Sequence, residues 1–340
     1  MRGDDRAPKR RSVWRNLAQR RSPVSLRRAA EGESVRTIVV ALAANIVIAI
    51  AKLIAGLVSR STALQAEAAH SAADSVNEVF LAIGLRRDRQ PADETHPFGH
   101  GRARFLWAFM AAIASFLIGG CLSIALAIAH FREPHSMSGG AVAWIVLAVA
   151  FAADGTSWLQ SVRQARRQAR EYGLTLGRYF RVASDPVVRA IVVEDSAALV
   201  GLALAATGLL LSRILHSSVP DSLASLLIGL LLAVTAFGLA RPLADFLVGR
   251  SLPPPLLERL AAIFREEDVI EEVLSLRATY TGPEEVVVAA KVRPSPTLKI
   301  EQLTRAMDDL DHRIRLALPL VADVFIDVTS HRGEDGTPAP

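Results

Sequence analysis

Acidic and imidazole side chains recur at one-turn spacing in the apolar stretch from Thr62 to Leu85. Residues three and four apart share one face of an α-helix, so this spacing predicts a single polar row. The row contains Glu67, His70, Asp74, Asn77 and Glu78. An imidazole and a carboxylate one turn apart, as in His70 and Asp74, can hold a divalent zinc, iron, cobalt or manganese ion. A hydrogen-bonded pair without a metal is the alternative.

A second group of candidate ligands lies in the loop that follows this helix, in the sequence DETHPFGHGR. The loop supplies Asp93, Glu94, His96 and His100. Carboxylate and imidazole are zinc ligands, so these residue types predict a second metal site. The alternative is a turn shaped by Pro97 and the glycines, whose polar groups are only solvated.

The composition indicates what kind of protein must position these groups. The chain has 340 residues, of which 51% are hydrophobic and 21% charged, and its mean hydropathy is +0.30. These values favour a polytopic membrane protein over a soluble one. The net charge of +5 does not indicate nucleic-acid binding, because the basic residues lie between apolar segments. Cys121 is the only cysteine, which excludes an internal disulfide and a cysteine-based metal motif.

Six apolar runs predict six membrane-spanning helices. They cover residues 37–58, 62–85, 105–130, 141–162, 190–211 and 222–243. Lys52 lies near the far end of the first run and is expected to extend its ammonium group toward the interface. We expect Glu67 to lie nearer the outer side of the membrane as an exit-side acid, and Asp221 to cap the sixth helix. Asp154 is expected to be a helix-end residue, with a metal ligand as the alternative.

The distribution of basic residues predicts that both termini are cytosolic. Residues 1–36 carry more than ten Arg or Lys, and the loops after the second and fourth spans are also rich in arginine. The opposite side carries only Arg60, Arg132 and Arg213. The loop with His96 and His100 therefore faces the cytosol.

The chain changes character after Arg250, where the sequence SLPPP ends the apolar part. Residues 256–264 and 300–318 have helical periodicity, whereas 273–280, 286–292 and 322–328 have the pattern of strands. This order predicts a small α+β domain of ferredoxin-like type. We thus predict a basic disordered tail (1–35), a membrane domain (36–250), a cytosolic domain (251–330) and a disordered tail (331–340).

The pairing of HSAAD (70–74) in a membrane helix with HPFGHGR (96–102) in the next loop resembles the cation diffusion facilitators. That resemblance implies six membrane helices and a cytosolic C-terminal domain that pairs two protomers. It also implies a cytosolic-side metal site at Asp93 and His100, with His96 as a possible addition. The C-terminal domain is expected to dimerise without a full zinc cluster, because Asp327 stands alone at the position where the family carries a ligand.

The fifth span contains two adjacent acids, Glu194 and Asp195. Asp195 is the expected third metal ligand, because it is a carboxylate inside a membrane helix. The resemblance implies another ligand four residues earlier, but Ile191 occupies that position and cannot bind a metal. Glu194 is the expected substitute, although it points about 100° away around the helix. The alternatives are a water ligand at the metal, and a Glu194 that pairs with a basic residue or exchanges protons.

These observations lead to a functional hypothesis. The run from Ser184 to Gly201 resembles a branch that includes a mitochondrial zinc–proton exchanger. We expect a homodimer in the inner membrane, surrounded by lipid, that exports zinc from the cytosol in exchange for protons. No enzymatic activity, cofactor or nucleic-acid partner is expected. Asn77 is predicted to orient Asp74, with a hydrogen bond that joins two helices as the alternative. An iron, manganese or cobalt exporter of the same family is the alternative, followed by a membrane metal sensor without transport.

Overall fold

The computed structural model describes residues 35–132, 141–171, 175–177, 186–283, 285–296 and 299–329. The predicted terminal tails lie outside these residues, apart from Val35, which begins the first described helix. The chain separates into two compact units. Of the described residues, those in 35–87 and 104–244 form the helical unit, and those in 88–103 and 245–329 form the mixed unit.

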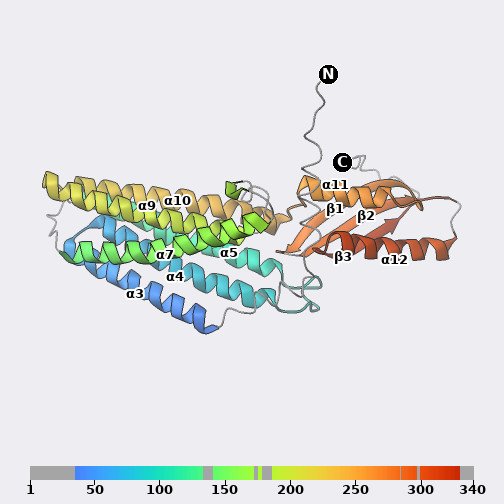
Figure 1. Ribbon diagram of the computed structural model, residues 1–340, viewed down its shortest axis with the longest axis horizontal. Coiled ribbons are helices and arrows are strands. Elements are labelled where there is room, and N and C mark those ends of the chain that lie inside the picture. The colour runs from blue at the N-terminus through green and yellow to red at the C-terminus, as the bar shows by residue number, and fades with distance from the viewer. Residues whose placement is uncertain are drawn as a thin grey trace, which may run out of the picture. The chain divides into compact units, whose positions relative to one another are not determined.

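The helical unit contains all of the predicted membrane helices, most of them longer than the apolar runs (Figure 1). They are α3 (Val35–Ser59), α4 (Thr62–Asp88), α5 (Arg102–Ala114) with its continuation α6 (Leu122–Arg132), α7 (Ala141–Glu171), α9 (Pro186–Leu215) and α10 (Val219–Val248). Among the described residues, five spans are long and apolar enough to cross a membrane. The exception is α4, whose 27 residues would suffice in length but whose polar row lowers its hydropathy.

The third predicted span contains a feature that its sequence did not indicate. A π-helical segment, Ser115–Cys121, joins α5 to α6. Its Gly119 and Gly120 are buried, and a Cβ atom at Gly120 would lie 3.1 Å from the Cβ of Ala233 in α10. These two glycines therefore allow the third span and α10 to pack closely.

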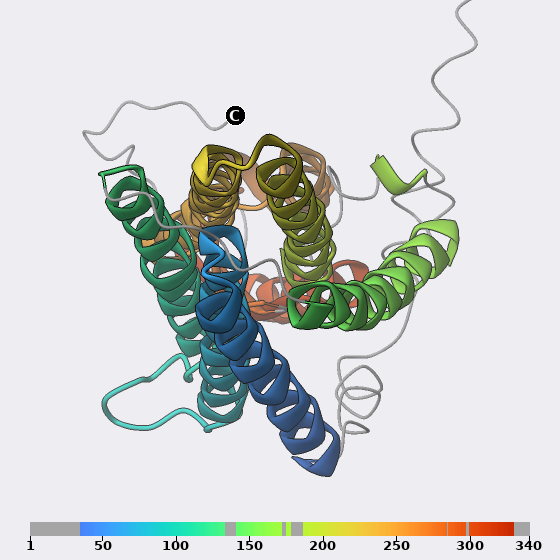
Figure 2. The same ribbon diagram turned by 90° about the vertical axis from the view of Figure 1, so that its left-hand side faces the viewer.

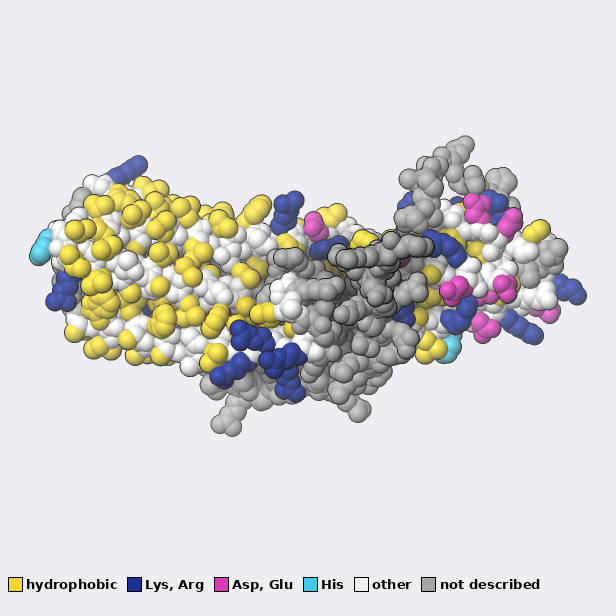
Figure 3. Space-filling model, turned by 45° about the horizontal axis from the view of Figure 1, so that its top comes forward, with side chains coloured by type: hydrophobic (Ala, Val, Ile, Leu, Met, Phe, Trp, Pro, Cys, Tyr) yellow, Lys and Arg dark blue, Asp and Glu magenta, His cyan; other side chains and the backbone are white. Residues whose placement is uncertain are grey.

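The helical unit is built for an apolar environment. Helix α7 packs against both α9 and α3, as the view along the helices shows (Figure 2). The core between helices includes Leu64, Leu202 and Ile228, each at most 1% exposed. Large hydrophobic side chains also cover the outside of this unit (Figure 3), and Val234, for example, is 71% exposed. Such an apolar exterior suits lipid.

The mixed unit has the element order that the sequence predicted. Its elements are α11 (Pro254–Arg265), β1 (Ile270–Gly282), β2 (Glu285–Pro294), α12 (Ile300–Ala317) and β3 (Val321–Val328). The sheet order is β1-β2-β3, with β1 antiparallel and β3 parallel to β2. Side chains buried between sheet and helices include Phe264, Val288, Leu310 and Ile314, all fully buried.

Candidate functional site

Helix α4 carries the centre of the candidate site. The Nδ1 atom of His70 lies 3.6 Å from Oδ1 of Asp74, one turn later, as the spacing predicted. The side chain of His70 is only 6% exposed, and that of Asp74 is 34% exposed. The other ring nitrogen of His70, Nε2, is buried and has no hydrogen-bond partner among the described residues. Buried polar atoms are normally paired, so this nitrogen is suited to accept a metal ion.

Helix α9 directs its two adjacent acids to different neighbours. The side chain of Asn77 in α4 donates to both carboxylate oxygens of Glu194, at 3.1 and 3.0 Å. Asp195 instead accepts hydrogen bonds from Ser161 at 2.8 Å and Ser157 at 3.4 Å, both in α7. The two carboxylates diverge because consecutive residues point about 100° apart around a helix. Asn77 was expected to orient Asp74, but its partner in the structure is Glu194.

The structure thus brings the predicted site residues into one region without closing a metal shell. Asp195 interacts electrostatically with both His70 and Asp74, and Glu194 interacts with Asp74. However, among the described residues their ligand atoms do not form a group within 4.8 Å of one another. Ile191, at the position where the resemblance implied a ligand, is 40% exposed. His70 and Asp74 of α4 thus form an acidic cluster with Glu194 and Asp195 of α9, in which the ligand atoms are not yet close enough to share one ion.

A buried ion-pair network borders this site. The predicted positions of two of its members, Lys52 and Asp154, are wrong. Lys52 of α3 does not reach an interface: it is fully buried, with Nζ 3.2 Å from Glu67 and 3.5 Å from Asp154. The Nζ atom also donates to Ser71 at 2.9 Å. Glu67 is 0% exposed and lies near the beginning of α4, and Asp154 lies well inside α7 rather than at its end. The available signal was a charge inside an apolar run, which requires a partner.

Asp221 has a different role from the one predicted. Asp221 lies in the first turn of α10, but the hydrogen bonds of its carboxylate hold the beginning of α4. Its carboxylate accepts hydrogen bonds from Ser61 Oγ at 2.6 Å and from the backbone N–H groups of Thr62 and Ala63. These are among the amide groups that a helix start leaves without an internal partner. Asp221 therefore fixes the end of the helix that carries His70.

The loop between α4 and α5 brings its three predicted ligands together. Asp93, His96 and His100 are the one set of metal-binding side chains among the described residues whose ligand atoms lie within 4.8 Å of one another. Asp93 is 3.5 Å from a ring nitrogen of each histidine, and the two imidazole rings are 4.2 Å apart. The other nitrogen of His100, Nδ1, lies 3.3 Å from the carbonyl oxygen of Pro91, which leaves Nε2 directed at Asp93.

Asp93 also organises the turn of this loop. Its Oδ1 accepts hydrogen bonds from the hydroxyl group of Thr95 at 2.7 Å and from the backbone N–H groups of Thr95 and His96. The Thr95 hydroxyl, followed by the backbone amides, lowers the pKa of Asp93 to about 2. A depressed pKa stabilises the turn above the ordinary pKa of 3.8, and this contribution is lost as the pH falls through about 2. Asp93 is therefore ionised whenever a metal could bind near neutral pH.

We expect Asp93→Ala to eliminate metal binding in the loop, because it removes both a ligand and the acceptor that shapes the turn. Zinc stoichiometry can be measured by titrating the purified Asp74→Ala chain with and without Asp93→Ala. The site should be lost at pH 7, whereas Glu94→Ala, a neighbouring exposed acid, should leave it intact. Equal stoichiometry with and without Asp93 would contradict a metal site in this loop.

The loop packs on the mixed unit through two contacts. The ring of Phe98 meets the ring of Phe325 in β3 edge-on, with centroids 6.0 Å apart. Gly101 lies against the turn between β1 and β2, where a Cβ atom would be 2.7 Å from the carbonyl oxygen of Thr281. Such a distance excludes any side chain without a backbone shift. The candidate loop site is therefore fixed to the surface of the mixed unit.

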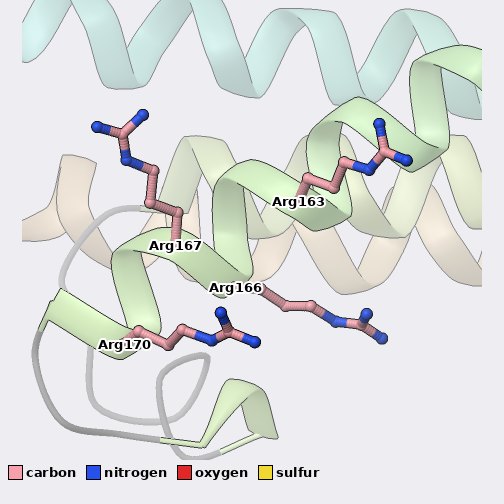
Figure 4. Close-up of a pocket in the computed structure, with 4 residues that line it drawn as sticks. All are labelled: Arg163, Arg166, Arg167 and Arg170. Atoms are coloured by element: carbon pink, nitrogen blue, oxygen red, sulfur yellow. The ribbon is translucent and has the colours of Figure 1, made fainter.

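Four arginines occupy the last turns of α7 and line one hollow (Figure 4). They are Arg163, Arg166, Arg167 and Arg170. They belong to the arginine-rich segment after the fourth span, which was used above to predict the orientation of the chain. Arg178 and Arg181 of the same segment lie outside the described residues. Guanidinium groups at the end of a membrane helix are typical of its cytosolic end.

Comparison with known proteins adds independent information. The model of the cation efflux transmembrane domain matches residues 38–248, which is more than half of the chain. Metal tolerance protein C4 of Arabidopsis thaliana is 27% identical over 272 residues, which cover 80% of this chain and 60% of that protein. The mitochondrial proton-coupled zinc antiporter SLC30A9 of Mus musculus is 29% identical over 257 residues, covering 76% and 45%.

A bacterial relative is similar over more of its own length. The manganese efflux system protein MneP of Bacillus subtilis is 25% identical over 245 residues, which cover 72% of this chain and 78% of that protein. The chain thus spans about half the length of the plant and mouse relatives. The family match agrees with the two motifs, the apolar helices and the C-terminal α+β unit described above. This chain is a multi-pass membrane protein that belongs to the cation efflux family.

Proposed function

We propose that the protein exports a divalent metal ion, zinc in the first place, from the cytosol in exchange for protons. The observation that carries the proposal is the buried His70 imidazole. One of its nitrogens lies beside Asp74, and the other has no hydrogen-bond partner in the described part of the chain. Both residues interact with the acids of α9. A histidine nitrogen with carboxylate oxygens is a donor set for zinc and similar ions.

The exchange with protons follows from the chemistry of the ligands. A metal ion binds ionised carboxylates and a neutral imidazole, so its binding releases protons and protons displace it. We assign His70, Asp74, Asp195 and Glu194 to this transport site. Two relatives support the direction of transport and its coupling to protons. One is named a proton-coupled zinc antiporter, and the other is named a manganese efflux system protein.

The remaining parts of the proposal concern the setting of the site. Both termini lie in the cytosol, the protein resides in the cell inner membrane, and the mixed unit pairs two copies into a homodimer. Asp93, His96 and His100 form a cytosolic-side metal site. Asp327 of β3 forms an ion pair with Lys291 at 3.6 Å. We expect the C-terminal unit to dimerise without a full zinc cluster.

Reconstituted vesicles with a pH gradient test the function. Uptake of zinc, iron, manganese and cobalt is measured with the purified chain, and each metal is compared with protein-free vesicles. Zinc flux that depends on the proton gradient supports the proposal. Flux of manganese, iron or cobalt without zinc flux would favour the alternative substrates, and metal binding without any flux would indicate a sensor.

A further inference from the structure

Asp154 lies on the face of α7 that meets the acids of the site. Asp154, Ser157 and Ser161 are spaced by three and four residues and therefore share this face. Ser157 and Ser161 donate to Asp195 in α9, so the face is directed toward the proposed transport site. Asp154 also interacts electrostatically with His70 and Asp74. Helix α7 thus contributes a carboxylate to the same acidic region.

Asp154 is held by a buried cation of the chain itself. The ammonium group of Lys52 lies 3.5 Å from Asp154, 3.2 Å from Glu67 and 2.9 Å from Ser71, the residue after His70. A buried charge without a partner would be costly, so Lys52 needs acidic partners in this position. The observation that a cation is already bound between these carboxylates shows that the region is suited to positive charge.

The members of this network differ in their accessibility. The side chains of Lys52 and Glu67 are 0% exposed, whereas that of Asp154 is 23% exposed. Asp74, its electrostatic neighbour, is 34% exposed. The carboxylates of Asp74 and Asp154 are thus both partly exposed, whereas that of Glu67 is enclosed. If Asp154 moves toward a metal ion, Lys52 keeps Glu67 and Ser71 as closer partners.

We infer that Asp154 is a direct ligand of the transported metal and that Lys52 is a tethered cation which competes with the metal for Asp154. The inference rests on the proposed transport site. It supplies an oxygen ligand from α7 where Ile191 of α9 cannot provide one. Glu194 stays in the transport site beside the metal, where Asn77 holds its carboxylate, and Asp154 takes the fourth ligand position. His70, Asp74, Asp195 and Asp154 together would give the four ligands that zinc prefers.

If Lys52 and the metal compete for Asp154, substituting Asp154 and substituting Lys52 should change the zinc affinity in opposite directions. Removing the charge of Asp154 should weaken zinc binding, because a ligand is lost. Removing Lys52 together with Glu67 should strengthen it, because Asp154 becomes available and a nearby positive charge disappears. A purely structural ion pair predicts a loss of binding in both cases, so the sign of the second effect distinguishes the two explanations.

The experiment measures zinc affinity of the full-length chain with a competing chelator, in an Asp93→Ala background that silences the loop. We expect Asp154→Asn to weaken binding by about tenfold or more. Asp154→Glu, which keeps a carboxylate, should recover part of that loss. The double variant Lys52→Met/Glu67→Gln should bind several-fold more tightly, and adding Asp154→Asn should abolish this gain. Asp245→Asn, an exposed acid outside the network, serves as the matched control.

The outcomes separate this inference from the proposed function. Unchanged affinity in Asp154→Asn, or weaker binding in the folded double variant, would overturn the inference while zinc flux in the wild-type chain upholds the transport function. Absence of zinc flux and zinc binding in the wild-type chain would overturn both. Folding of each variant is checked by its thermal unfolding midpoint, and the Asp154→Glu variant keeps the test decisive if Asp154→Asn is unstable.

Discussion

Replacing Asp74 by alanine is expected to reduce zinc transport by about 100-fold or more, because it removes a ligand and the partner of His70 together. Without the Asp74 carboxylate, the proposed site loses one of its oxygen ligands, and the His70 imidazole loses the group that lies beside it. Zinc flux is measured in vesicles with an imposed proton gradient and is compared with that of the wild-type chain at equal protein density.

The matched control is Asp308→Ala, which removes an exposed acid of α12 and should leave the flux unchanged. Asp74→Glu provides a second comparison, since it keeps a carboxylate but moves it by one methylene group. Partial flux in Asp74→Glu with none in Asp74→Ala would support direct coordination. Wild-type flux in Asp74→Ala would exclude this residue from the transport site.

Asp221→Ala is expected to produce the largest loss of stability, about 3 kcal/mol in the free energy of unfolding. The substitution leaves the hydroxyl group of Ser61 and the N–H groups of Thr62 and Ala63 without their acceptor in a buried position. A buried donor without a partner costs the full free energy of its desolvation, because no hydrogen bond offsets it. Unfolding of the purified chain in detergent, followed by the loss of helical circular dichroism, measures the effect.

Asp221→Asn should cost less, because the side-chain carbonyl of asparagine still accepts a hydrogen bond from the start of α4. Zinc affinity of the folded fraction should stay close to that of the wild-type chain at low temperature. The reason is that Thr62 and Ala63, the residues that Asp221 caps, lie about two helical turns before His70. Equal unfolding curves for Asp221→Ala and the wild-type chain would contradict the capping role.

The sequence predicted those parts of the site that depend on local spacing. His70 and Asp74 meet because they are one turn apart, and the loop ligands meet because few residues separate them in a tight turn. The order of helices and strands in the C-terminal unit also followed from local periodicity. Each of these features depends only on residues that are close together in the chain.

Contacts between distant helices could not be predicted in this way. Lys52 reaches Asp154, 102 residues later, and Asn77 reaches Glu194, 117 residues later. One sequence shows that such buried charges need partners, but it does not show which helices pack together. The π-helical segment before α6 was missed because its backbone change follows from packing rather than from an apolar pattern.

The grouping of the loop Asp88–Ala103 with the C-terminal residues has a consequence for how this protein can be divided experimentally. A soluble fragment that starts at residue 251 would lack Phe98, which packs on Phe325, and Phe246, whose ring lies 5.3 Å from that of Tyr280. Both missing rings would leave aromatic surface open to water. A fragment intended for crystallisation or domain exchange should therefore begin no later than Asp245. The α4–α5 loop should be joined to it as an added segment.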